Sequence, residues 1–298
     1  MLRDTQTLAV GSMLLSGLLW GTTWMPLKHF AAQGLTGLTL TVCTYGAVGA
    51  IALPWLLRDV GRWRGQWPLL AGAALGGGLA NACFVTAMMQ GEVARSMLLF
   101  YLTPLWGILG GRVFLGERIT PLRFLAGTLA IAGAVLVLGG PAVLTAAPRW
   151  TDVLAIGAGL FFTVQNLCAR AADRVPVSSK TLAAFVGCAI VSLVLLPLAG
   201  HTFPGVSGPL AVQLALYAFV WLTLAMAIQA YGVTHLEAGR TAVLVIFELA
   251  AAVVTALWIG GERLTVAGWT GAALIVAAAF LEARPAAPAP SPKQEVPA

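Results

Sequence analysis

Hydrophobic residues in this chain form long unbroken runs that are separated by short polar segments. Ten runs approach the roughly 20 apolar residues that a helix needs to cross a bilayer core of about 30 Å. They do not show the alternation, in pieces of about ten residues, that is typical of a spanning β-barrel. The pattern therefore predicts ten membrane-spanning helices, near residues 7–28, 36–57, 67–90, 94–114, 120–139, 152–171, 180–199, 209–233, 239–259 and 265–283.

The second half of the chain repeats the first half at an offset of about 145 residues. Glu92-Val93-Ala94-Arg95 aligns with Glu237-Ala238-Gly239-Arg240. At the same offset, Gly116-Glu117-Arg118 aligns with Gly261-Glu262-Arg263. A repeat on this scale indicates a duplicated unit.

The duplication predicts the architecture. The two units cover residues 7–139 and 152–283, and each holds five of the predicted helices. Because five is odd, the second unit must enter the membrane from the opposite side. We therefore expect an all-α integral membrane protein built from two inverted five-helix repeats. Such pairs are common in secondary transporters, whose substrate site lies near the midplane between the repeats.

Composition and charge agree with a membrane protein. The chain is 59% hydrophobic and 9% charged, with a mean hydropathy of +0.89, outside the range of soluble globular domains. With the N terminus in the cytoplasm, 13 of the 17 basic residues lie inside, which follows the positive-inside rule. Topology thus explains the pI of about 9.6, and no nucleic-acid partner is expected. The four basic residues predicted outside are Lys28, Arg95, Arg149 and Arg263.

These charges predict a multi-pass protein of the plasma membrane, the bacterial inner membrane, with both termini cytoplasmic. Residues 284–298, rich in Pro and Ala, are predicted to form a disordered cytoplasmic tail. Membrane lipid is an expected partner, and the chain could act as a monomer, although the sequence leaves the oligomeric state open.

Motifs for catalysis and metal binding are absent from the sequence. No phosphate-binding loop occurs, and the three histidines are isolated. The four cysteines stand singly in apolar runs, so neither a metal nor a disulfide is indicated. We therefore expect no cofactor and no enzymatic activity. A membrane-embedded enzyme is a weaker alternative, and a channel lacks the expected ring of like charges.

Several short motifs resemble one transporter family. They are Leu19-Trp20-Gly21-Thr22-Thr23-Trp24 followed by Lys28, Tyr101-Leu102-Thr103-Pro104, and the two Gly-Glu-Arg turns before predicted helices 5 and 10. In this order and spacing, the chain resembles the EamA-like exporters of the drug/metabolite transporter superfamily over about residues 7–283. The resemblance implies an inverted five-plus-five arrangement and export of small metabolites from the cytoplasm. Among members, the chain looks most like exporters of amino acids, including aromatic ones.

Two positions depart from many members of that family. Thr44 and Tyr45 stand in the predicted helix 36–57, where many relatives carry an arginine. Leu249 stands in the predicted helix 239–259, at a position where many relatives carry a proline. A permease for another metabolite or drug class therefore stays open as an alternative.

Glu248 is the one acidic residue near the centre of a predicted span. An ionised carboxylate is costly there unless it is paired or hydrated, and such residues often mark substrate or proton paths. Thr241, Glu248 and Thr255 are spaced by seven residues and share one helix face. Glu248 is therefore a candidate for substrate binding and for proton coupling. The alternative is a glutamate that only holds helices together by hydrogen bonds.

Aromatic and amide side chains in several spans predict a substrate cavity. Trp20 and Trp24 are four residues apart, so they would stack on one helix face. Pro104 should kink the predicted helix 94–114 and is a candidate kink or gating residue. Aromatic walls with neutral hydrogen-bonding groups suit a zwitterion with an apolar side chain. Tryptophan also lines membrane interfaces, and amides bond across helices, so a structural role is the alternative. The predicted cavity residues are Trp20, Trp24, Asn81, Phe84, Tyr101, Phe161, Gln165, Asn166 and Glu248.

Overall fold

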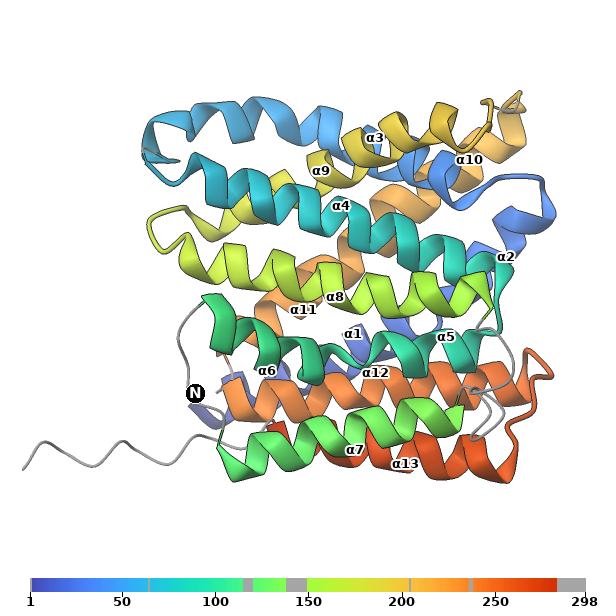
Figure 1. The fold of residues 1–298 in the computed structure, drawn as a ribbon. Coiled ribbons are helices and arrows are strands. Elements are labelled where there is room, and N and C mark those ends of the chain that lie inside the picture. The colour runs from blue at the N-terminus through green and yellow to red at the C-terminus, as the bar shows by residue number, and fades with distance from the viewer. Residues whose placement is uncertain are drawn as a thin grey trace, which may run out of the picture.

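A computed structural model describes residues 2–63, 65–114, 120–137, 149–203, 205–235 and 238–282. All regular secondary structure within these ranges is helical (Figure 1). The long helices run side by side, so the connecting segments gather at two opposite ends of the molecule. The predicted tail, 284–298, lies outside the described residues.

Each predicted run falls on one helix or on two or three consecutive helical segments. The first half contains α1 (Leu2–Gly21), α2 (Trp24–Ala32), α3 (Gly37–Arg58), the 3-10 helix η1 (Val60–Trp63), α4 (Trp67–Gln90), α5 (Val93–Phe100), α6 (Thr103–Phe114) and α7 (Pro121–Val137). The second half contains α8 (Trp150–Ala171), α9 (Val177–Leu198), α10 (Gly208–Leu216), the π-helix η3 (Tyr217–Leu222), α11 (Thr223–His235), α12 (Ala238–Trp258) and α13 (Val266–Glu282).

Length and hydropathy separate two groups of helical segments. Among the described residues, seven segments are long and apolar enough to cross a membrane. Three shorter apolar helices, Phe124–Val137, Phe247–Trp258 and Val266–Ala278, lie within α7, α12 and α13.

Local sequence fixes where several helices begin. The hydroxyl of Thr36 accepts a hydrogen bond of 3.2 Å from the backbone N–H of Thr39 and caps α3. Ser207 caps α10 in the same way, through the backbone N–H of Leu210. These hydroxyls satisfy donors that the first helical turn leaves free.

Three predicted spans are interrupted: the fourth just before Pro104, where a kink was expected, and the first and eighth, where continuous helices were expected. The first span divides at Thr22 and Thr23, whose hydroxyls bond back to the carbonyls of Leu18 and Leu19 and compete with the helical ladder. The fourth span divides at Tyr101 and Leu102, and the eighth contains the π-helix η3. Hydrophobic periodicity gave no sign of these interruptions, because all three segments keep an apolar composition.

Pro104 lies in the first turn of α6, just after the break in the fourth span. Proline has no N–H, so it cannot donate to the carbonyl of Phe100 four residues earlier. That carbonyl oxygen instead faces Gly159 of α8, at 2.6 Å from where a Cβ atom would stand.

The helices pack in two groups that meet along α5 and α12. The first group, called here the α8 bundle, consists of α4, α5, α6 and α8. The second group, the α1 bundle, consists of α1, α11 and α12, with α1 in contact with both α11 and α12. The short helix α2 continues α1 after a two-residue break and is bonded to α12 through Trp24 and Thr255, but it packs on α4 and α3 and so lies where the two groups meet. At the two sides of the molecule, α3 packs on α9 and α7 packs on α13 (Figure 1).

Glycine allows the closest helix contact between α7 and α13. A Cβ atom on Gly133 would lie 2.7 Å from the carbonyl oxygen of Gly271, and one on Gly271 would lie 2.5 Å from the carbonyl oxygen of Gly133. Neither position has room for a side chain, so both glycines are required for these helices to approach so closely.

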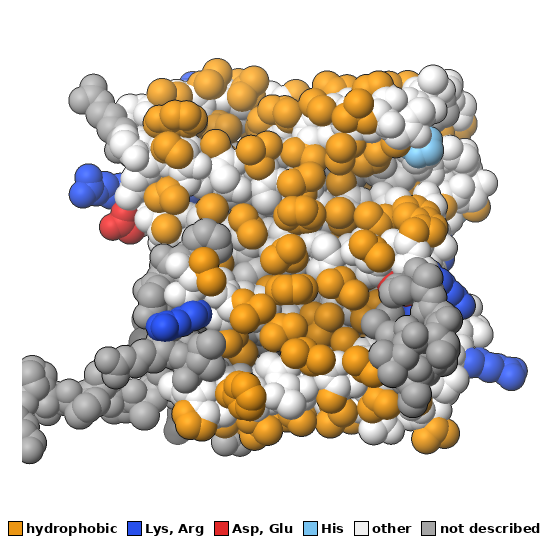
Figure 2. All heavy atoms as spheres, in the orientation of Figure 1, with side chains coloured by type: hydrophobic (Ala, Val, Ile, Leu, Met, Phe, Trp, Pro, Cys, Tyr) orange, Lys and Arg blue, Asp and Glu red, His pale blue; other side chains and the backbone are white. Residues whose placement is uncertain are grey.

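The outer surface is apolar where a bilayer would surround it. In Figure 2, hydrophobic side chains cover the middle of the visible face, and charged side chains lie toward the two ends. Large apolar side chains on several helices are more than half exposed, among them Ile51, Leu57, Leu193, Val194 and Val212. A water-facing surface seldom carries so much exposed apolar area, but lipid accommodates it.

Candidate functional site

The side chains of Tyr101 and Glu248 lie within interaction distance of each other. Tyr101 is buried at the break between α5 and α6, and Glu248 lies at the centre of α12. This contact therefore joins the α8 bundle to the α1 bundle. It also gives the carboxyl group within the apolar span a polar partner, as buried polar groups require.

Glycines of α1 hold the backbone of Glu248 in position. A Cβ atom on Gly21 would lie 2.7 Å from the carbonyl oxygen of Glu248, and one on Gly17 would lie 3.3 Å from its backbone nitrogen. The backbone of α12 thus rests directly on α1. This packing sets where the Glu248 carboxyl group meets Tyr101.

Three indole N–H groups connect the interrupted spans to neighbouring helices. Trp20 donates to the Oε1 atom of Gln229 at 3.1 Å. Trp24 donates to the hydroxyl of Thr255 at 3.0 Å. Trp221, in η3, donates to the hydroxyl of Thr23 at 3.1 Å.

Trp20 and Trp24, predicted to share one helix face, lie on either side of the break in the first span, and their indoles donate to different helices, α11 and α12. Sequence reasoning also missed Gln229 and Trp221. Gln229 carried a usable signal, since it is a lone amide in an apolar span.

Aromatic rings gather around Phe100, a residue that sequence reasoning did not select. Its ring centroid lies 5.0 Å from that of Phe84, 5.6 Å from that of Tyr101 and 5.6 Å from that of Phe162. Phe162, and not the predicted Phe161, therefore forms the ring contact from α8. The backbone carbonyl of Phe161 instead lies against Gly76 of α4.

The three predicted amides lie in separate environments. Asn81 accepts a hydrogen bond of 2.9 Å from Thr41 and so links α4 to α3. Gln165 packs its amide over Gly77, and Asn166 is exposed. The described contacts thus bring Tyr101 and Glu248 together, while those of Asn81 and Gln165 involve other partners.

A pocket of about 560 Å³ lies elsewhere, between α3, α4, α8 and α9. Its lining includes Thr36, Thr86, Gln90, Trp150 and His201. None of the predicted cavity residues contributes to this lining, so the pocket is not the predicted substrate cavity.

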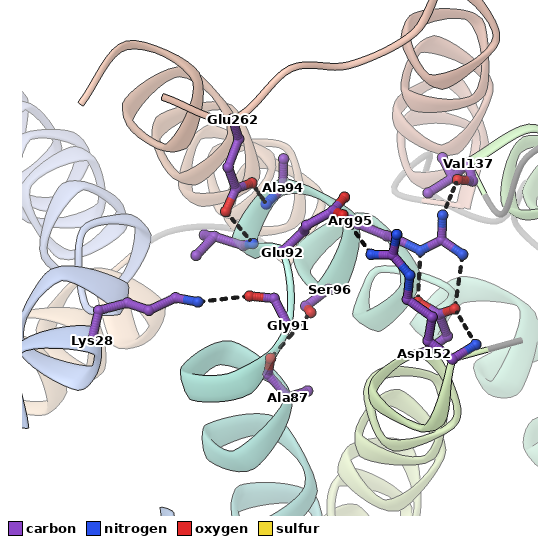
Figure 3. A network of polar contacts seen from close by, with 12 residues as sticks. Lys28, Ala87, Gly91, Glu92, Ala94, Arg95, Ser96, Val137, Asp152 and Glu262 are labelled. Atoms are coloured by element: carbon purple, nitrogen blue, oxygen red, sulfur yellow. Dashed lines mark hydrogen bonds and ion pairs between the residues drawn. The ribbon is translucent and has the colours of Figure 1, made fainter. Parts of the chain in front are cut away.

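A polar network covers the end of the molecule that carries Lys28 (Figure 3). We call this end the Lys28 face. Arg95 binds Asp152 with two hydrogen bonds, of 2.6 and 2.8 Å, and also donates to the carbonyl of Val137. Arg149 pairs with Glu92 at the surface, and this contact raises the pKa of Arg149.

Glu262 of the second Gly-Glu-Arg turn serves a helix from the other half of the chain. Acidic residues stabilise the N-termini of helices, so the sequence alone would assign Glu262 to α13, the helix that follows it. Glu262 instead accepts hydrogen bonds from the backbone N–H groups of Val93 at 2.6 Å and Ala94 at 2.8 Å, at the start of α5 (Figure 3). Glu117 of the first turn lies outside the described residues.

The opposite end of the molecule carries its own polar contacts. Gln66 donates to Asp173 and accepts from the backbone N–H of Arg174, which joins the start of α4 to the end of α8. The hydrogen bond from Gln66 lowers the pKa of Asp173. Ser179 of α9 donates to Asp59, after α3, at 2.8 Å.

Within the described ranges, no group of three His, Cys, Asp or Glu side chains is arranged to hold a metal ion. The cysteines are free thiols, and Cys188 is buried.

The long apolar helices and the exposed apolar surface around them define a multi-pass membrane protein. The EamA-like transporter family matches residues 7–139 and again residues 149–283. The chain belongs to this family and is a membrane transporter of the drug/metabolite superfamily.

Known relatives agree with this assignment. An uncharacterized transporter of Archaeoglobus fulgidus is 26% identical over 91% of this chain and 94% of that protein. The chloramphenicol-sensitive protein RarD of Pseudomonas aeruginosa is 38% identical over 28% of this chain and 25% of its own length. A solved crystal structure shares the fold, with a TM-score of 0.58 and 21% identity over 93% of this chain and 96% of the other.

Proposed function

We propose that this protein is a secondary transporter that exports amino acids, aromatic or apolar ones among them, by alternating access. The observation that carries the proposal is the Tyr101–Glu248 contact. It places a carboxyl group at the centre of a span, beside a break in a facing helix and next to a cluster of aromatic rings. Interrupted helices near the midplane are where transporters of this general build hold their substrates.

The proposed architecture is ten spanning helices in two inverted repeats, residues 7–139 and 152–283. The helix contacts support it. If α1 corresponds to α8, and α12 to the α5–α6 pair, then the contact of α1 with α12 has its counterpart in the contact of α8 with α5 and α6. Likewise, α1 packs on α11 as α8 packs on α4. In the α3–α9 pair and in the α7–α13 pair, the two helices in contact are each other's counterparts in the two repeats.

The proposed location is the bacterial inner membrane, with both termini in the cytoplasm and the Lys28 face outside. Charge supports this orientation. Lys28, Arg95 and Arg149 all lie in the network of the Lys28 face, and Arg263 follows Glu262 there. The other 13 basic residues are assigned to the opposite side, as the positive-inside rule expects.

The chemistry around Tyr101 and Glu248 supports an amino-acid substrate. The carboxyl group of Glu248 can meet an ammonium group, and the rings of Phe84, Phe100 and Phe162 can surround an apolar side chain. The indoles of Trp20 and Trp24 border the same hydrophobic cluster. The other proposed lining residues are Asn81, Phe161, Gln165 and Asn166, and Pro104 is proposed as the kink or gating residue.

Glu248 is also the proposed proton-coupling group. A carboxyl group in an apolar span is neutral when protonated and needs a partner when ionised, so protonation changes which neighbours it can hold. In this scheme a proton and the substrate ammonium group alternate at Glu248. No cofactor takes part, and the protein performs no chemical conversion.

A proteoliposome assay tests the proposal. Purified protein is reconstituted, and uptake of labelled phenylalanine, tryptophan and leucine is measured with and without an imposed pH gradient. We expect saturable transport that the gradient accelerates, and Glu248→Gln should abolish the acceleration. Asp173→Asn, at an exposed position, is the control and should behave like wild type. Transport of none of these amino acids would refute the substrate class, and an unchanged gradient response in Glu248→Gln would refute its coupling role.

A drug permease is the second candidate, because one relative is named a chloramphenicol-sensitive protein. Labelled chloramphenicol belongs in the same panel. Transport of chloramphenicol without transport of amino acids would favour this alternative. Recovery of a chemically altered product would instead indicate a membrane enzyme.

A further inference from the structure

We propose that Lys28 and Glu262 form a gate that closes the substrate path at the Lys28 face. The inference rests on the proposed function in one respect, namely that the protein alternates between states open to opposite sides. It adds the residues that hold one side shut.

Glu262 forms the first part of the gate. It lies between α12 and α13, in the connection that leaves the α1 bundle. Its two carboxylate oxygens accept from the backbone N–H groups of Val93 and Ala94, at the start of α5 in the α8 bundle. Both of these residues are buried, with exposed fractions of 0% and 1%. Their N–H groups are among those that have no hydrogen-bond acceptor within the helix. Glu262 supplies the acceptors for these N–H groups of the first turn of α5.

Lys28 forms the second part of the gate. It lies in α2, which continues α1, is bonded to α12 through Trp24 and packs on α4, and its ammonium group donates to the carbonyl oxygen of Gly91 at 2.7 Å. Gly91 follows α4 in the α8 bundle. The Lys28 cation is also attracted by the carboxylates of Glu262 and Glu92. Both residues of the gate therefore hold the same short segment, residues 91–94 (Figure 3).

The other ion pairs described at this face have a different role. Arg95 and Asp152 join α5 to α8, and Glu92 and Arg149 join the segments just before these two helices. These pairs lie at the α8 bundle and would move with it as one body. The contacts of Glu262 cross from the α1 bundle to the α8 bundle, and the contact of Lys28 runs from α2 to the end of α4. In the proposed opening α2 moves with α1, so both sets of contacts break.

The gate has a physical basis for being reversible. Hydrogen bonds to charged groups are stronger than neutral ones, yet water replaces them at little net cost once the face opens. Closure therefore depends on a small number of contacts that can be exchanged for hydration. Gates of this kind bias an equilibrium between two states and do not fix one of them.

A distance measurement between spin labels tests the gate without any substrate. One label is placed at Val153 of α8 and the other at Ile259, which follows α12; both side chains are more than half exposed. Pulsed electron resonance then reports the distance between the two bundles at the Lys28 face. We expect Glu262→Ala and Lys28→Met each to populate a longer distance. The closed-to-open ratio should fall roughly tenfold, which corresponds to about 1.4 kcal/mol.

Arg149→Gln is the matched control. It removes an ion pair at the same face that does not connect the bundles, so the distance distribution should stay as in the wild type. Glu262→Gln is the milder variant. It keeps one carbonyl oxygen and should shift the distribution less than Glu262→Ala, and it serves in place of Glu262→Ala if that protein does not fold.

The outcomes separate this inference from the proposed function. A longer distance in the Lys28 and Glu262 variants, but not in Arg149→Gln, supports the gate even if the amino-acid panel shows no transport. An unchanged distance in folded Glu262→Gln and Lys28→Met overturns the gate even if amino acids are transported. An equal shift in Arg149→Gln also overturns it, because the effect would then be general to the face.

Discussion

Substitution of Gly21 by alanine should disturb the Tyr101–Glu248 site from a distance. The new Cβ atom would lie 2.7 Å from the carbonyl oxygen of Glu248, 2.8 Å from the Cβ atom of Ala251 and 3.0 Å from the backbone nitrogen of Ala252. Ordinary contact needs about 3.5 Å, so α1 and α12 must separate by roughly 0.8 Å. The atoms in the way belong mostly to the backbone of α12, so rotation of a side chain cannot relieve the contact.

The expected cost follows from this overlap. Overpacking of a close interface costs about 1–3 kcal/mol. Alanine regains at most about 1 kcal/mol of helix propensity over glycine, and less here because Gly21 ends α1. We therefore expect a net loss of about 1–2 kcal/mol in stability. Transport should fall further, since a displacement near 1 Å at a functional group can cost about 100-fold in rate.

Gly11→Ala is the control within the same helix. No atom lies within 4 Å of the Cβ position at Gly11, so the substitution adds helix propensity without a clash. The assays are thermal unfolding in detergent and initial transport rates in proteoliposomes. The packing argument fails if Gly21→Ala is as stable and as active as Gly11→Ala.

Four further substitutions test other contacts of the structure. Arg95→Gln should destabilise the protein by about 3 kcal/mol, because it leaves Asp152 buried and unpaired, with its side chain 3% exposed. Arg149→Gln should cost less than about 1 kcal/mol, because its ion pair with Glu92 is exposed; equal losses in denaturant unfolding would contradict this ranking. Trp24→Phe and Thr255→Val should each cost about 0.6 kcal/mol, and the double variant no more than either alone, since both remove one hydrogen bond. Additive losses in a double-mutant cycle would show that the two residues act independently.

The class of protein could be predicted from sequence because it depends on properties that are local in the chain. A run of apolar residues long enough to cross a bilayer is visible without knowledge of any partner. The duplication and the charge asymmetry are likewise readable along the chain. Glu248 was also predictable as a candidate, because a single acid in an apolar span stands out wherever the helix packs.

The partners of these residues could not be predicted in the same way. Tyr101 and Glu248 are distant in sequence, and their contact depends on how α12 rests on the glycines of α1. The role of Phe100 was missed for the same reason, because phenylalanine is ordinary in any apolar run. Its ring contacts exist only where α4, α5 and α8 come together.

The sequence by itself determined that this chain has apolar helical spans in two related halves, because hydrophobic length and repetition are properties of consecutive residues. Only the tertiary structure decided that Glu262 caps α5 rather than α13, and that the first and eighth spans are interrupted. Backbone donors and carbonyls that a helix leaves free must find partners, and those partners come from whichever segment packs nearby. Which segment packs nearby is a property of the assembled fold.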